Sequence, residues 1–130
     1  MSTIKVTNVQ DTSGGNSSTS AEIFSGRAKV WVEFSGQSSA TAITSFGVSS
    51  VVRTSNGNYT VNFSSNFANT DYAVFATSGV NNDTWDDGNQ DADNIALVLN
   101  KFADKVYIGC GDLDDGDNDD QDRISVVIFA

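Results

Sequence analysis

Apolar and polar residues alternate along several short stretches of the chain. In residues 28–34 one side of the alternation is apolar and consists of Ala28, Val30, Val32 and Phe34. The other side carries Lys29, Trp31 and Glu33. A period of two residues predicts a strand with one buried and one exposed face. Residues 59–63 repeat this pattern, whereas 123–129 are apolar on both sides, which predicts a strand that is central or covered on both faces.

Turn residues separate these stretches. Asn56-Gly57 is typical of a tight hairpin, because both positions tolerate positive φ, and it would join 51–54 to 59–63. Gly47 suggests a bulge or bend within the β-prone run 40–54. Four further runs favour strands: 4–9, 71–78, 95–102 and 106–110. We therefore expect an all-β fold, an antiparallel two-sheet β-sandwich of about seven or eight strands, with no helix longer than two turns.

The length of 130 residues fits one domain. We expect residues 21–130 to form the sandwich and residues 1–20 to form an N-terminal arm. Within the arm, residues 11–20 are a Gly/Ser-rich tract that predicts a linker. The β-prone residues 4–9 suit attachment to a partner by addition of a strand to a sheet edge.

The composition argues against catalysis. Histidine, the commonest general base and zinc ligand, is missing from the chain. Cys110 is the single cysteine, so no intrachain disulfide can form, and its place after an apolar alternation predicts a core residue. We expect no enzyme activity. There is also no apolar run of about 18 residues and no secretory signal, so we expect no membrane insertion.

The formal net charge of −10 is concentrated in two segments. Residues 83–93 hold five aspartates, residues 112–122 hold seven, and the remaining five acidic residues face seven Lys and Arg. Such a surface repels nucleic acid and anionic membranes, so we expect neither as a partner.

The second acidic segment has two interpretations. Asp112, Asp114 and Asp117, arranged around Gly116, are candidate ligands for Ca²⁺, which prefers several oxygen ligands. The segment lacks the terminal Glu of an EF-hand loop. The favoured alternative is a solvated acidic loop that binds no metal and keeps particles apart. We expect no other cofactor.

The two tryptophans are candidate binding residues. Trp85 lies within the first acidic segment, and Trp31 points away from the apolar side of its strand. Glu33 beside Trp31 could serve a sugar site, but a carboxylate on a solvent-exposed strand face is the favoured interpretation.

Four motifs follow one another between residues 28 and 72. They consist of Ala28, Lys29, Trp31, Val32 and Phe34; Ser45, Phe46, Val48, Ser49 and Ser50; Gly57, Tyr59, Thr60, Val61 and Phe63; and Tyr72. This ordered set resembles a β module found near the C-terminal ends of bacteriophage tail-fibre and other virion structural proteins, of the marine or cyanobacterial phage type. In that family the module usually ends a long chain with a shaft. The start of this chain at Met1 without a shaft favours a small head-decoration or knob protein.

The resemblance implies a non-enzymatic structural protein on the virion surface, either a head decoration or a tail-fibre component. The alternative that it implies is a carbohydrate- or receptor-binding module of a fibre tip. The expected location is the virion, assembled in the host cytoplasm. The expected partners are capsid or tail proteins, further copies of this chain, and a host-surface glycan or protein.

Overall fold

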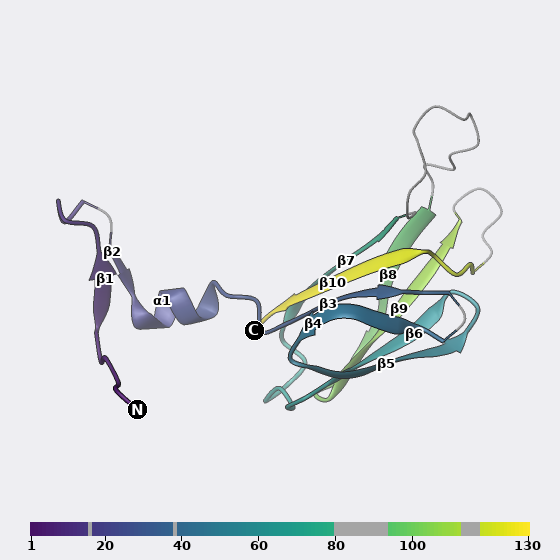
Figure 1. The fold of residues 1–130 in the computed structure, drawn as a ribbon, viewed down its shortest axis with the longest axis horizontal. Coiled ribbons are helices and arrows are strands. Elements are labelled where there is room, and N and C mark those ends of the chain that lie inside the picture. The colour runs from purple at the N-terminus through teal and green to yellow at the C-terminus, as the bar shows by residue number, and fades with distance from the viewer. Residues whose placement is uncertain (16, 38, 80–93, 113–117) are drawn as a thin grey trace.

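The computed structural model describes residues 1–15, 17–37, 39–79, 94–112 and 118–130. Two four-stranded antiparallel sheets pack face to face (Figure 1). The first has the order β4-β3-β10-β7, with bounds Thr41–Phe46, Val30–Ser35, Arg123–Phe129 and Ala73–Gly79. The second has the order β5-β6-β9-β8, with bounds Val48–Ser55, Asn58–Phe63, Lys105–Asp112 and Asn94–Lys101. The expected all-β sandwich is confirmed.

The core lies between the two sheets, where alternate residues of the central strands meet. Its fully buried members include Val32 and Phe34 of β3, Tyr59 and Val61 of β6, Val106 and Ile108 of β9, and Ile124, Val126 and Ile128 of β10. The rings of Phe34 and Tyr59 meet edge to face across the core, with centroids 5.2 Å apart. Complete burial of such side chains stabilises the fold by about 1.5–3 kcal/mol each. β10 pairs with β3 on one side and β7 on the other, which confirms its expected central position.

The run 40–54 forms two strands rather than one bent strand. β4 and β5 belong to different sheets, and Gly47 carries the chain from one to the other with a φ of +72°. A Cβ at this position would lie 2.8 Å from the carbonyl oxygen of Lys29. The crossing therefore requires both the positive φ and the missing side chain of glycine.

The Asn56-Gly57 hairpin is confirmed. Arg53 pairs with Tyr59 and Ser55 with Asn58, and Gly57 has a φ of +64°.

The N-terminal arm contains regular structure that the linker interpretation of residues 11–20 missed. β1 (Asn8–Gln10) pairs with β2 (Ser17–Thr19), and α1 (Ser20–Ser25) follows directly. The hairpin turn is held by Asp11, whose side chain accepts from the Gly15 N–H at 3.0 Å. In Figure 1 the arm projects away from the sandwich. No helix in the described ranges is long and apolar enough to cross a membrane.

Cys110 is a core residue, as expected, and is 2 % exposed on β9. Burial, with a smaller contribution from the charge of Asp120, raises the pKa of its thiol to about 12.

Because the thiolate is the reactive form, we expect iodoacetamide to leave the folded protein unmodified at pH 8 and to label it fully in guanidinium. Because the folded protein holds the thiol proton of Cys110 more tightly than the unfolded chain does, Cys110 contributes stability below about pH 8.5. This contribution is lost as the pH rises towards 12. Rapid labelling of the native protein would contradict this placement.

Candidate functional site

An apolar row crosses the outer face of the first sheet. Trp31 lies opposite Phe46 on one side and Val127 on the other, and Val127 lies opposite Phe75. Directly paired residues of antiparallel strands project from the same face, so these four side chains form one transverse row. Phe46 and Phe75 at its two ends are 58 % and 63 % exposed. We call Phe46, Trp31, Val127 and Phe75 the apolar row; it contains one of the two predicted binding residues, Trp31.

The neighbouring positions on the same face are polar. Ser125 lies between Glu33 on β3 and Thr77 on β7. Glu33 accepts a hydrogen bond from Arg123 Nη1 at 3.0 Å, and both side chains are more than a third exposed. This geometry is typical of a surface ion pair and agrees with the favoured interpretation of Glu33 as a solvent-face carboxylate.

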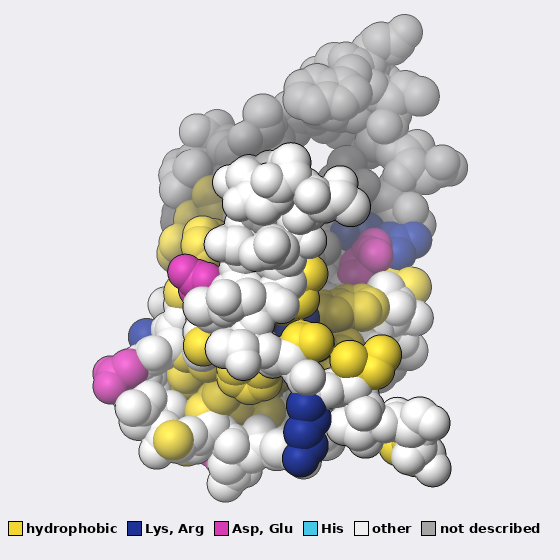
Figure 2. Space-filling view, turned by 90° about the vertical axis from the view of Figure 1, so that its left-hand side faces the viewer, with side chains coloured by type: hydrophobic (Ala, Val, Ile, Leu, Met, Phe, Trp, Pro, Cys, Tyr) yellow, Lys and Arg dark blue, Asp and Glu magenta, His cyan; other side chains and the backbone are white. Residues whose placement is uncertain are grey.

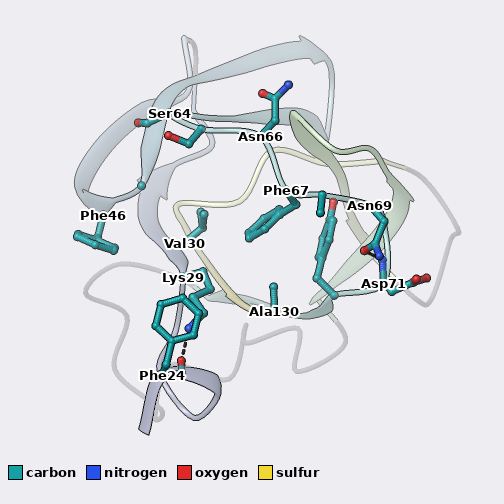
Figure 3. Close-up of a pocket in the computed structure, with 14 residues that line it drawn as sticks. Phe24, Lys29, Val30, Phe46, Ser64, Asn66, Phe67, Asn69, Asp71 and Ala130 are labelled. Carbon is teal, nitrogen blue, oxygen red and sulfur yellow. Dashed lines mark hydrogen bonds between the residues drawn. The ribbon is translucent and has the colours of Figure 1, made fainter. Parts of the chain in front are cut away.

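A groove of about 750 Å³ opens at the end of the sandwich where the arm joins it (Figure 3). We call it the end groove. Phe24 of α1 and Phe46 of β4 stand on one side of it, Phe67 projects into its middle, and Asn69 and Asp71 lie on the opposite side. Figure 2, viewed from the side of the arm, shows apolar side chains gathered at the surface around the arm.

The floor of the end groove is held in place by the turn between β8 and β9. The Phe67 N–H donates to the Ala103 carbonyl at 2.8 Å, and the Tyr72 hydroxyl donates to the Phe102 carbonyl at 2.9 Å. The rings of Phe67 and Tyr72 lie 4.8 Å apart. Desolvation by burial raises the pKa of Tyr72 further above physiological pH. The floor is thus apolar and preorganised.

One wall of the end groove comes from α1, which follows the arm. The Lys29 ammonium lies 3.3 Å from the centroid of the Phe24 ring and donates a hydrogen bond to the Phe24 carbonyl. Such a cation–π contact is attractive, and it fixes the end of α1 against the start of the sandwich. The pKa of Lys29 is lowered, first by desolvation and then by the charge of Arg27.

A polar cluster lies where the chain re-enters the sandwich before β10. Arg53 Nε donates to both carboxylate oxygens of Asp120, at 2.8 and 2.7 Å. The Gly57 N–H and the Tyr59 hydroxyl donate to the same carboxylate at 2.9 and 2.7 Å. We call Arg53, Gly57, Tyr59 and Asp120 the Asp120 cluster.

The cluster has a structural role. The hydrogen bond from Arg53, followed by those from Gly57 and Tyr59, lowers the pKa of Asp120. The Asp120 side chain is only 13 % exposed. It fastens the chain after the second acidic segment to the β5–β6 hairpin. The interpretation of residues 112–122 as a solvated loop is therefore wrong for Asp120, and nothing in the spacing of the seven aspartates distinguishes it from its neighbours.

The strand ends that bracket the two acidic segments lie together. Asn94 at the start of β8 pairs with Asp112 at the end of β9, and Gly79 at the end of β7 pairs with Arg123 at the start of β10. Both segments therefore leave the sandwich from the same end, as loops of a sandwich are expected to do.

Most of the predicted metal and binding residues fall outside the described ranges. Asp114, Asp117 and Trp85 lie there, and of Asp112 only the backbone, in β9, is described. Among the residues that the structure describes, no three His, Cys, Asp or Glu side chains come together as a metal site. Calcium binding by Asp112, Asp114 and Asp117 therefore stays a prediction.

No protein-family model, no curated protein and no solved structure matches this chain. A function must therefore be argued from the arm, the apolar row and the end groove, together with the resemblance carried by residues 28–72.

Proposed function

We propose that this chain is a non-enzymatic structural protein on the surface of a bacteriophage particle, and that it attaches to its partners through the N-terminal arm. The observation that carries this proposal is the exposure of apolar side chains along the arm. Ile4, Val6 and Val9 are 88 %, 53 % and 52 % exposed, and Phe24 at the end of α1 is 57 % exposed. A projecting segment that exposes its apolar side chains gains stability when a partner covers them.

The apolar row supports the same proposal. Phe46 and Phe75 are among the most exposed large side chains of the sandwich. Contiguous exposed apolar surface on a folded domain marks interaction sites, and aromatic residues are enriched among those that carry binding energy. A chain with two such surfaces is suited to an assembly in which it contacts more than one neighbour.

Two carboxylates of the sandwich, Asp120 and Glu33, support a non-enzymatic role. Asp120 is bound by Arg53, and Glu33 by Arg123. The lowered pKa of Asp120 keeps it ionised at neutral pH, where a general acid needs a proton to give.

The phage assignment draws its support from the ordered motifs between residues 28 and 72. The paired strands that carry them are β3 with β4 and β5 with β6. The net charge of −10 suits an outer-surface protein, since like charge keeps neighbouring particles apart.

Deleting residues 2–20 tests the role of the arm. Every residue of the buried core lies at position 30 or later, so we expect the shortened chain to keep its melting temperature and the circular dichroism signal of the sandwich strands. We expect it to be lost from purified particles, whereas a full-length chain with Leu97→Ser, an exposed substitution on the second sheet, should be incorporated normally. Incorporation of the shortened chain at the level of the intact one would refute the proposal that the arm attaches the protein.

A further inference from the structure

β4 is an open sheet edge. It is the outermost strand of the first sheet, and all six of its residues are exposed. Its sequence, TAITSF, contains no charged residue and no proline, two of the features that usually prevent pairing at an edge. The register against β3 shifts at Ile43, so the regular part of the edge is residues 44–46, next to the end groove. A strand of this kind presents unpaired backbone N–H and C=O groups that can template a further strand.

The edge at the other side of the same sheet is better covered. β7 runs beside β8 of the second sheet, whereas β4 contacts its neighbour β5 far less (Figure 1). Of the two edges of this sheet, β4 is therefore the one at which an added strand meets less obstruction.

The open edge continues into the end groove. Phe46 is the last residue of β4 and also lines the groove, on the same side as Phe24 (Figure 3). An extended peptide paired with β4 would gain main-chain hydrogen bonds along the edge and could place an apolar side chain in the groove. This combination is the usual basis of peptide recognition by strand addition.

We propose that the β4 edge and the end groove bind residues 4–9 of the arm of a second copy of this chain. This inference rests on the proposed function, in which the arm is the attachment element, and it names the surface that the arm binds. Residues 4–7 precede β1 and form no regular structure, while Ile4 and Val6 alternate with Lys5 and Thr7. Among the described strands, β1 pairs with β2 alone, so its other edge is also open.

Charge favours this occupant. Residues 1–10 contain Lys5 and no acidic residue, in a chain whose net charge is −10. The end groove carries the carboxylate of Asp71 at its rim, and the Lys29 ammonium is engaged by Phe24. Lys29 keeps its charge, so the groove holds one charged side chain of each sign, and Lys5 of the arm can pair with Asp71 at the rim.

The direction of the arm favours exchange between copies over binding within one chain. In Figure 1 residues 1–10 lie beyond α1, away from the sandwich and from β4. Reaching the β4 edge of the same chain would require the arm to fold back. Two copies that exchange arms cover both arms and both edges, which is the closed arrangement expected of a symmetric dimer.

Sedimentation analysis of the full chain and three variants tests the inference. We expect the intact chain to dimerise, and Ile4→Ser with Val6→Ser in the arm, or Phe46→Ser in the groove, to weaken the dimer by about tenfold or more. Phe75→Ser is the matched control, because Phe75 is an equally exposed phenylalanine on the same sheet face at the opposite edge. It should dimerise like the intact chain. All these side chains are at least half exposed, so the melting temperatures should agree at concentrations where the intact chain and the variants are all monomeric.

Mixing the variants distinguishes arm exchange from nonspecific association through exposed apolar side chains. The arm variant keeps an intact groove and the Phe46→Ser variant keeps an intact arm, so an equimolar mixture should form heterodimers at concentrations where each variant alone is monomeric. Failure of the mixture to associate, or equal effects of Phe46→Ser and Phe75→Ser, would overturn the inference.

The same measurement separates this inference from the proposed function. If the intact chain stays monomeric at its highest soluble concentration while deletion of residues 2–20 still removes it from particles, the arm binds another virion protein. That outcome overturns arm exchange between copies and leaves the proposed function standing.

Discussion

Replacing Asp120 with alanine is expected to lower the free energy of unfolding by about 3 kcal/mol, because hydrogen bonds to a charged group are strong and the substitution leaves their donors unpaired. The donors are the Gly57 N–H and the largely buried Tyr59 hydroxyl. The contact with Arg53 adds less than its geometry suggests, since the Arg53 side chain is 29 % exposed and solvent screens the pair. Urea unfolding measures the difference.

Asp119→Ala is the matched control, because it removes the same charge from the adjacent, exposed position. It should change the free energy of unfolding by no more than about 0.5 kcal/mol. Equal effects of the two substitutions would show that the Asp120 cluster does not hold the chain to the β5–β6 hairpin.

The Asp120 cluster also predicts a dependence on pH. The pKa of Asp120 is lowered in the folded protein relative to its ordinary value of about 3.9. Its contribution to stability is therefore complete above that value and is lost as the pH falls through the lower, folded pKa. The difference in stability between the intact chain and Asp120→Ala should shrink as the pH is lowered below about 4. A difference that stays constant down to the acid transition would contradict the cluster.

Gly57→Ala is expected to destabilise the fold by about 3 kcal/mol, from a side chain forced into the left-handed region and from overpacking. Gly57 has a φ of +64°, and an added Cβ would overlap the Cys110 carbonyl oxygen and lie 2.7 Å from the Asp119 nitrogen. Both neighbours are backbone atoms held by hydrogen bonds, Cys110 N–H to the Gly57 carbonyl and Asp119 N–H to the Cys110 carbonyl. Moving these atoms aside would weaken those hydrogen bonds.

Gly79→Ala is the control for this substitution, because an added Cβ there meets no atom of the described residues within 4 Å. We expect Gly79→Ala to leave the midpoint of urea unfolding within about 0.5 kcal/mol of the intact chain. If Gly57→Ala behaves in the same way, the turn between β5 and β6 does not adopt the conformation described here.

The strands of the sandwich could be predicted because the order of apolar and polar residues within a strand shows which of its side chains are buried. The alternation in 28–34 shows which side chains of β3 face the core, and the apolar character of both sides of 123–129 shows that β10 is central. The Asn56-Gly57 pair located the β5–β6 hairpin for the same reason, since a tight turn depends on the backbone preferences of its own residues.

The arm contained a signal that the Gly/Ser composition obscured. Thr19 and Glu22 form a capping box: the Glu22 N–H donates to the Thr19 hydroxyl at 3.1 Å, and the Thr19 N–H donates to Glu22 Oε2 at 2.7 Å. A Thr followed three residues later by Glu is the sequence signature of a helix start, so α1 could have been predicted. The adjoining hairpin could not, because its turn depends on the side chain of Asp11.

The surfaces that carry the proposed function depend on which strands become neighbours. The outward direction of Trp31 was predictable, but its position between Phe46 and Val127 follows from pairing across three strands. The end groove likewise combines α1, the end of β4 and the segment before β7. Periodicity within one strand contains no information about such contacts.

The central claim is that this protein is a structural component of the outer surface of a phage particle. Electron microscopy of purified, intact particles with a gold-labelled antibody against the chain tests it most directly. The proposed function predicts regular labelling of intact particles at one structure, either the head or the tail, with the chain recovered among the particle proteins. Purified particles that lack the chain and bind no antibody, while the protein is abundant in the unassembled fraction of the lysate, would contradict the claim.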